Sequence, residues 1–160
     1  MSAAAATAAP PGPRPAPLPG DVLLHAGPLL AALAIALNDY VLRPRAPGWL
    51  SGKLSDAGLC YLLPFLVLAA LEWGGQLAAW VGQRAFRPLG PVAVTTSTLL
   101  AAAYFIGQEL VPPFGRFHVA LVERLLSGRH VVLTRDPSDL GCLVFTALAF
   151  LELRRLRSHG

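Results

Sequence analysis

Ten polar residues, most of them ionisable, fall at the edges of hydrophobic stretches rather than in polar loops. Paired carboxylates can act as general acid and base or can hold a divalent metal ion, and nearby amides and hydroxyls can complete such a site. The sequence has no GxSxG, P-loop, GxGxxG or Ser–Lys signature that would specify a reaction. The candidate residues are Asn38, Asp39, Lys53, Ser55, Asp56, Gln108, Glu109, Arg135, Asp136 and Asp139.

The composition indicates that these residues belong to a membrane protein. Of 160 residues, 54% are hydrophobic and only 14% are charged, whereas a soluble domain has about 25% charged residues. The formal net charge is +4, but the 13 basic residues are scattered among hydrophobic runs. Such scattering is typical of juxtamembrane charges and argues against a nucleic-acid partner.

Four hydrophobic segments must position the polar residues. They cover about 22–42, 54–73, 92–111 and 137–153, and residues 1–20 form an Ala/Pro-rich tail that we expect to be disordered. About 20 apolar residues span a bilayer as a helix, with about 17 as the lower limit. Because the backbone must satisfy its own hydrogen bonds in lipid, we predict an all-α, polytopic fold with four transmembrane helices in residues 21–157.

The connections between these segments differ in length. Residues 76–89 look like a short interfacial turn. The longer connection, 114–135, has apolar residues at helical spacing, which favours a helix lying in the interface between the third and fourth spans. The apolar positions are Phe117, Ala120, Leu121 and Leu125.

Four crossings would bring all ten candidate residues to one membrane interface. The first and third segments end, and the second and fourth begin, on the same side. An ionisable group below the headgroups costs about 3 kcal/mol, so such groups persist where they pair, face water or serve a function. The opposite side carries Asp21, Glu72 and Glu152, which the pattern indicates to be ordinary flanking charges.

Several candidates also have a purely structural interpretation. Asp136 followed by Pro137 is typical of a helix start, with Asp139 as the acid of a capping box. Lys53 could pair with Asp56 three residues later. Glu109 could simply sit at the interface.

Other residues inside the segments have local explanations. Pro64 should bend or interrupt its helix, and it frees the carbonyl of Cys60 one turn from Asp56. Cys60 and Cys142, the only cysteines, are expected to be small residues of membrane helices. His118 and His130 lie on the candidate side without HxxH, HExxH or DxD spacing, so we predict no metal site and no cofactor.

Two motifs resemble a group of small, uncharacterised bacterial four-pass membrane proteins. Residues 49–59, WLSGKLSDAGL, match a GKLSDxxGL-type motif that follows a first helix ending in Leu-Asn-Asp, here residues 37–39. Residues 136–140, DPSDL, match a DP[ST]DL motif at the last helix. The resemblance covers roughly residues 37–150 and implies the same topology, but it brings no activity with it.

A looser resemblance, to the VanZ-like family, implies an envelope role. It rests on Gln108 and Glu109, on residues 113–116, and on Asp136 and Asp139. Here Lys53 precedes Asp56, and the connection from residue 116 to 136 is longer than in that family.

These observations leave three classes of function. The first is a bacterial envelope protein of the inner (plasma) membrane, with both termini in the cytoplasm, whose polar cluster binds a lipid headgroup or a membrane-protein partner. The second is a membrane enzyme acting on a lipid-linked or phosphorylated substrate. The third is a small proton- or ion-coupled carrier that uses Asp56 and Glu109. Besides the bilayer, a second copy of the chain is a candidate partner.

Overall fold

The computed structural model describes residues 18–46, 48–82, 89–125 and 136–158, and all regular structure within them is helical. The prediction of an all-α fold is therefore confirmed. Most of the Ala/Pro-rich tail lies outside the described residues. Its last residue, Gly20, is buried in a turn rather than disordered.

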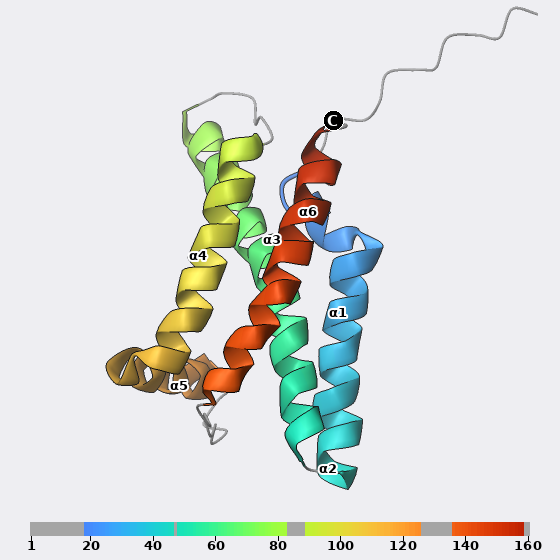
Figure 1. Cartoon of the computed structure of the whole chain (residues 1–160). Helices are drawn as coiled ribbons and strands as arrows, with labels where there is room; N and C mark the ends of the chain where they lie inside the picture. Colours follow the sequence, from blue (N-terminus) through green and yellow to red (C-terminus); the bar gives the residue numbers. More distant parts are fainter. Residues whose placement is uncertain (1–17, 47, 83–88, 126–135, 159–160) are drawn as a thin grey trace, which may run out of the picture.

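Four helical columns run side by side, and α3 (Trp49–Val81) contacts the other three (Figure 1). The first column is α1 (Ala26–Leu37), continued by a π-helix, η2 (Asn38–Leu42), and by α2 (Arg43–Arg45). The others are α4 (Pro91–Leu110) and α6 (Leu143–Ser158), which follows a 3-10 helix, η3 (Pro137–Cys142). A short 3-10 helix, η1 (Asp21–Leu24), precedes α1.

A shorter helix, α5 (Pro112–Leu125), occupies the first part of the connection between α4 and η3. It packs against α4 and lies at the lower end of α4 and α6 in Figure 1. Its apolar residues Phe117, Leu121 and Leu125 are exposed, as an amphipathic helix in an interface requires.

Two helical stretches in the described part of the chain are long and apolar enough to cross a bilayer, Ala26–Arg45 and Trp49–Val81. The second is longer than predicted. Its 33 residues extend about 50 Å at 1.5 Å per residue, whereas the hydrocarbon core is about 30 Å thick. The predicted turn at residues 76–89 is therefore wrong for 76–81, which are helical. Glycines at 74 and 75 cost about 1 kcal/mol each but do not stop a helix that is otherwise well packed.

The first column also continues past its predicted end at Leu42. The N–H of Arg43 donates to the carbonyl of Asn38, which is the wide spacing of a π-helix. Pro44 lacks an N–H, and its ring would clash with the carbonyl four residues earlier in a regular helix. We attribute the π-helix to this proline, because a wider turn relieves the clash.

The core has two layers along the bundle. The layer nearer the chain ends contains Val22, Phe65, Leu68, Val94 and Leu153. The second layer is smaller: Cys60, Phe105 and Cys142, each from a different element, pack together with Ala57 and Leu143. Both cysteines are buried and unoxidised, in agreement with their predicted role as small packing residues.

Gly58 allows α1 and α3 to approach closely. A Cβ atom at this position would lie 2.7 Å from Cγ1 of Ile35 and 3.7 Å from the carbonyl oxygen of Ala31. The glycine of the GKLSDxxGL motif therefore has a packing explanation, since any larger side chain would push the two helices apart.

Pro64 does not interrupt α3, but the carbonyl that it frees finds a partner on another helix. Thr146 Oγ1 of α6 donates a 2.9 Å hydrogen bond to the Cys60 carbonyl oxygen, which is the acceptor that an N–H at position 64 would otherwise use. This contact joins α3 to α6 at mid-height. It shows how a helix-interior proline is tolerated in a low-dielectric bundle.

We predict that Thr146→Val lowers the free energy of unfolding by about 1–3 kcal/mol, because a buried carbonyl loses its side-chain donor. In a Pro64→Ala background the same change should cost much less, since the N–H that alanine restores at this position can bond the Cys60 carbonyl within the helix. Denaturant unfolding of the four proteins in detergent measures this coupling. Equal costs in both backgrounds would show that the proline and the threonine are independent.

Candidate functional site

The interfacial polar cluster is the set of described candidate residues at the end of the bundle where η2 and η3 each contact α3 and where η3 contacts α4. Asn38 is fully buried, and its Nδ2 donates to the Ser51 carbonyl and to Ser55 Oγ, at 2.7 Å each. Ser55 Oγ in turn donates to Asp39 Oδ1 at 2.8 Å. Arg43, one turn further along, pairs with the same Asp39 oxygen at 3.5 Å. The contacts of Asn38 and Asp39 with Ser51 and Ser55 join the π-helix to the first two turns of α3.

Lys53 connects α3 to η3. Its Nζ donates to Ser138 Oγ at 2.5 Å, forms an ion pair with Asp139, and lies 3.6 Å from Asp136 Oδ2. The side chain of Lys53 is 16% exposed and that of Asp139 is 9% exposed, so this pair is largely removed from water. The ammonium group thus contacts three side chains of η3 and its cap, two of them through hydrogen bonds.

Asp56, in the second turn of α3, interacts with the charges of both groups. Its carboxylate is attracted by Lys53 and Arg43 and repelled by Asp139 and Asp39. Within the described residues it makes no hydrogen bond, in contrast to the other aspartates of the cluster.

The helix-start interpretation is right for Asp136 and wrong for Asp139. Asp136 caps η3, since its Oδ1 accepts the Ser138 N–H at 2.9 Å and Pro137 occupies the first turn. This backbone hydrogen bond, aided by the positive charge of Lys53, lowers the pKa of Asp136. Asp139 turns instead towards Lys53 of α3. Lys53 therefore pairs across the bundle, rather than with Asp56 along its own helix, because η3 presents two carboxylates to it.

Gln108 and Glu109 lie at the end of α4, which packs against η3. They follow Phe105 of the small core layer by one turn and are 3% and 8% exposed. Gln108 Oε1 and Asn38 Oδ1 are buried acceptors without a hydrogen-bond partner in the described part of the chain. Arg135, the tenth candidate, lies outside the described residues, as does His130.

The charges at the opposite end were predicted to be ordinary flanking charges, and this prediction is wrong. Glu72 is completely buried, and its Oε1 lies 2.5 Å from Arg157 Nη2 of α6. The same guanidinium nitrogen contacts Asp21 Oδ1 at 2.9 Å. Glu152 of α6 accepts a hydrogen bond from Tyr61 of α3. The sequence did contain a signal for this network. Glu72 lies within an apolar run, and several arginines follow the last hydrophobic segment on the same side of the predicted bundle.

Gly20 completes this second network. Its N–H donates to Glu72 Oε2 at 2.9 Å, and its φ of 78° lies in the left-handed region. A Cβ atom here would also lie 2.9 Å from Nε1 of Trp73. The residue must be glycine for the chain to enter η1 in this position.

His118 of α5 contacts Tyr104 of α4 through Nδ1 and the phenol hydroxyl, and the rings meet edge to face. Burial lowers the pKa of His118. Across the described residues no group of three or more His, Cys, Asp or Glu side chains is arranged to hold a metal ion.

The class that these observations define is an all-α chain with two membrane-length helices and a buried polar cluster at one end. No protein-family model, curated protein or solved structure matches the chain. The motif resemblances therefore stay predictions, and the function rests on the geometry of the cluster.

We predict that Arg157→Gln destabilises the fold by about 3 kcal/mol, because Glu72 would be left as an uncompensated buried charge. Arg154→Gln removes the same charge from an exposed residue that stacks on Phe150 and should cost less than about 1 kcal/mol. Adding Glu72→Gln to Arg157→Gln should recover part of the loss. Detergent-micelle unfolding compares the variants, and equal losses for the two arginines would contradict the buried network.

Acid should weaken the docking of α5 on α4. Because the folded-state pKa of His118 is below its unfolded value of about 6.5, the unfolded chain binds the proton more tightly, and stability falls as pH drops below about 6.5. His118→Gln should remove this part of the pH dependence, seen as a smaller fall in unfolding temperature between about pH 7.5 and about pH 5.5. An unchanged pH profile in the variant would place the acid sensitivity elsewhere.

Proposed function

We propose that this protein is a four-pass membrane protein of a bacterial envelope whose interfacial polar cluster binds a lipid headgroup. The proposal has two parts, the topology and the ligand, and different observations support each.

The arrangement of the columns supports four crossings. Asp21 and Arg157, near the two ends of the described chain, are in contact, so an even number of crossings joins them. The columns also expose apolar residues on their outer faces, such as Leu30 of α1, Leu99 of α4 and Val144 of α6. Such surfaces suit lipid as the solvent.

The two columns that do not meet the combined condition of length and hydropathy have compensating features. In α4 the hydroxyls of Thr95, Ser97 and Thr98 donate to carbonyls of their own helix, so their polarity is satisfied internally. The last column gains length because η3 leads directly into α6.

The position of α5 supports placing the cluster at headgroup level. This amphipathic helix lies across the same end of the bundle as η3 and the end of α4 (Figure 1). A helix of this kind lies at the boundary between headgroups and acyl chains. The cluster beside it would therefore meet lipid headgroups, and it would do so from a partly dehydrated position in which polar contacts are strong.

The observation that carries the ligand proposal is the unused acceptor capacity of the cluster. Asn38 Oδ1 and Gln108 Oε1 are buried without a donor in the described part of the chain, and the Asp56 carboxylate has only electrostatic neighbours there. A buried acceptor without a partner costs about 1–3 kcal/mol. A headgroup that supplies donors would remove this cost, and the difference would favour binding.

Asp56→Asn is the variant that tests this proposal. Because Asp56 makes no hydrogen bond within the described residues, we expect the Asp56→Asn variant to unfold at the same temperature as the parent or at a higher one. Retention of co-purified phospholipid, counted by native mass spectrometry of the full chain in detergent, should fall by about tenfold, the change expected when one charge-assisted contact is lost. Glu123→Gln, a carboxylate on α5 outside the cluster, is the matched control.

The opposite pattern would contradict the proposal. If Asp56→Asn and Asp139→Asn both unfold at much lower temperature while lipid retention is unchanged, the cluster is a structural network. Chemical conversion of an added lipid that stops in Asp56→Asn would favour the enzyme alternative instead.

A further inference from the structure

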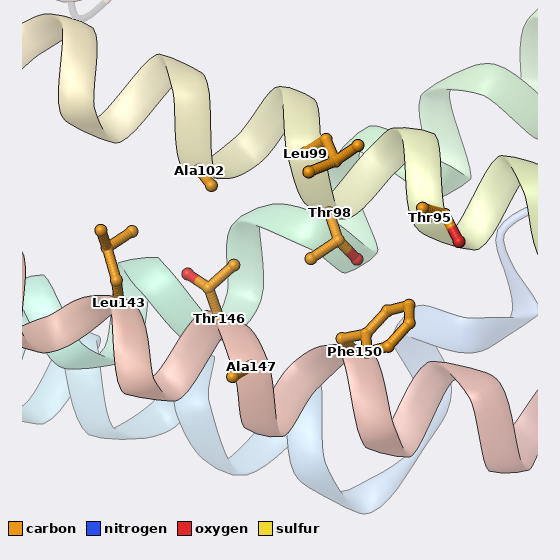
Figure 2. A pocket seen from close by; sticks show the side chains of 8 residues that line it. All are labelled: Thr95, Thr98, Leu99, Ala102, Leu143, Thr146, Ala147 and Phe150. Atoms are coloured by element: carbon orange, nitrogen blue, oxygen red, sulfur yellow. The ribbon is translucent and has the colours of Figure 1, made fainter.

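An apolar groove runs between α4 and α6 (Figure 2). It has a volume of about 320 Å³. The side chains that line it come from both helices: Thr95, Thr98, Leu99, Ala102, Leu143, Thr146, Ala147 and Phe150. It opens sideways, towards the surroundings of the bundle rather than into the core.

Three threonines line this groove, yet each of their hydroxyls already donates its proton to a carbonyl of the protein. Thr95 and Thr98 donate to carbonyls of α4 at 3.1 and 2.8 Å, and Thr146 donates to the Cys60 carbonyl at 2.9 Å. The threonines thus leave mainly their methyl groups to the groove. Its surface fits a saturated or unsaturated hydrocarbon and has no unpaired hydroxyl for a polar molecule.

The groove leads to the interfacial polar cluster. At one end it is lined by Leu143, which directly follows Cys142 of η3, and Cys142 Sγ lies 4.0 Å from the carbonyl oxygen of Lys53. On the α4 side it ends at Ala102, fewer than two turns before Gln108. The stretch from Thr95 to Ala102 spans about 10 Å along the helix, within the roughly 15 Å of one leaflet's hydrocarbon.

The charges at this end select the kind of headgroup. Lys53 already donates to Ser138 and Asp139 and lies 3.6 Å from Asp136, so three oxygen-bearing groups of this chain compete with a phosphate for its ammonium group. Among the described residues at this end, Asn38 Oδ1 and Gln108 Oε1 are buried acceptors without a partner, and Ser51 Oγ is a buried hydroxyl that can also accept. Asp56 has charged neighbours but no hydrogen bond there. Acceptors beside a surplus of carboxylates suit an ammonium group, which brings three N–H donors and a positive charge.

We infer that the groove and the cluster form a single phospholipid site, with an acyl chain between α4 and α6 and an ammonium-bearing headgroup at the cluster. The inference rests on the proposed headgroup function and adds to it the place of the chain and the charge of the headgroup. A groove that ends at a polar cluster matches an amphiphile better than it matches a uniformly apolar helix of a second copy.

The test uses the full chain in detergent and two probes with identical acyl chains, palmitoyl-oleoyl phosphatidylethanolamine and palmitoyl-oleoyl phosphatidylglycerol. Native mass spectrometry measures the dissociation constant of each. We expect the ethanolamine lipid to bind about tenfold more tightly than the glycerol lipid, and Asp56→Asn to abolish that preference.

The groove is tested by filling it. Ala102→Phe should weaken binding of the ethanolamine lipid by about tenfold, whereas Ala103→Phe, on the exposed face of the same helix, should leave it unchanged. Ala147→Phe fills the groove from α6 and replaces Ala102→Phe if that variant does not keep the parent's unfolding temperature.

Each contrary result overturns a different part. If the groove variants bind like the parent while Asp56→Asn loses the lipid, the acyl-chain site is wrong and the headgroup function stands. Equal affinity for the two lipids overturns ammonium recognition. A groove variant that loses only a dimer assigns the groove to a second copy. Binding of neither lipid by the parent chain overturns both this inference and the proposed function.

Discussion

Polar contacts join α3 to the last column at successive heights of the bundle, and three of them illustrate the constraint. Lys53 pairs with Asp139 of η3 at one end, and Thr146 donates to the Cys60 carbonyl at mid-height. Arg157 pairs with Glu72 at the other end. A shift of α6 by one helical turn, about 5.4 Å, would break all three. The contacts therefore define the register on which both polar ends and the groove depend.

The strength of this constraint comes from the cost of leaving such groups unpaired. Buried ion pairs add little net stability compared with apolar packing, but removing one partner costs several kcal/mol. The three contacts thus penalise alternative registers more than they stabilise the observed one. The hydrophobic effect that drives the packing of the apolar layers is not directional. The polar contacts therefore add specificity for one register of the helices.

The pairing of polar groups also explains why α6 differs on its two sides, one facing α3 and the other facing the groove. Towards α3 the last column presents polar groups that are paired, among them Thr146 Oγ1, Glu152 Oε2 and Arg157 Nη2. Towards the groove α4 and α6 show methyl and methylene groups, because each threonine hydroxyl is turned to a carbonyl. At the interfacial polar cluster, in contrast, acceptor capacity remains unmatched within the described residues. This contrast is why we place the ligand there.

The two ends of the bundle use similar residues for different purposes. At the end that holds residues 20 and 157, Glu72, Arg157, Asp21 and the Gly20 backbone form contacts that draw the start and the end of the described chain together. At the cluster end, Lys53 binds Ser138 and Asp139, but Asp56 makes no hydrogen bond within the described residues. Contacts that join distant segments are typical of a structural network, whereas a carboxylate and buried acceptors without donors are features that a ligand could satisfy.

The sequence by itself determined what depends on local chemistry and on solvent. Hydrophobic runs of membrane length predicted the helices, and Asp136 with Pro137 predicted the start of η3, because a cap involves only neighbouring residues. Pro64 predicted a freed carbonyl, because that loss is intrinsic to proline.

Only the tertiary structure decided which partner each polar group found. Asp139 pairs with Lys53 and does not act as a local capping residue. Glu72 is buried, and Thr146 donates to the Cys60 carbonyl. These choices depend on the rotation and register of helices distant in sequence. An isolated helix carries no information about the face that its neighbour will present, so spacing along the chain could not decide them.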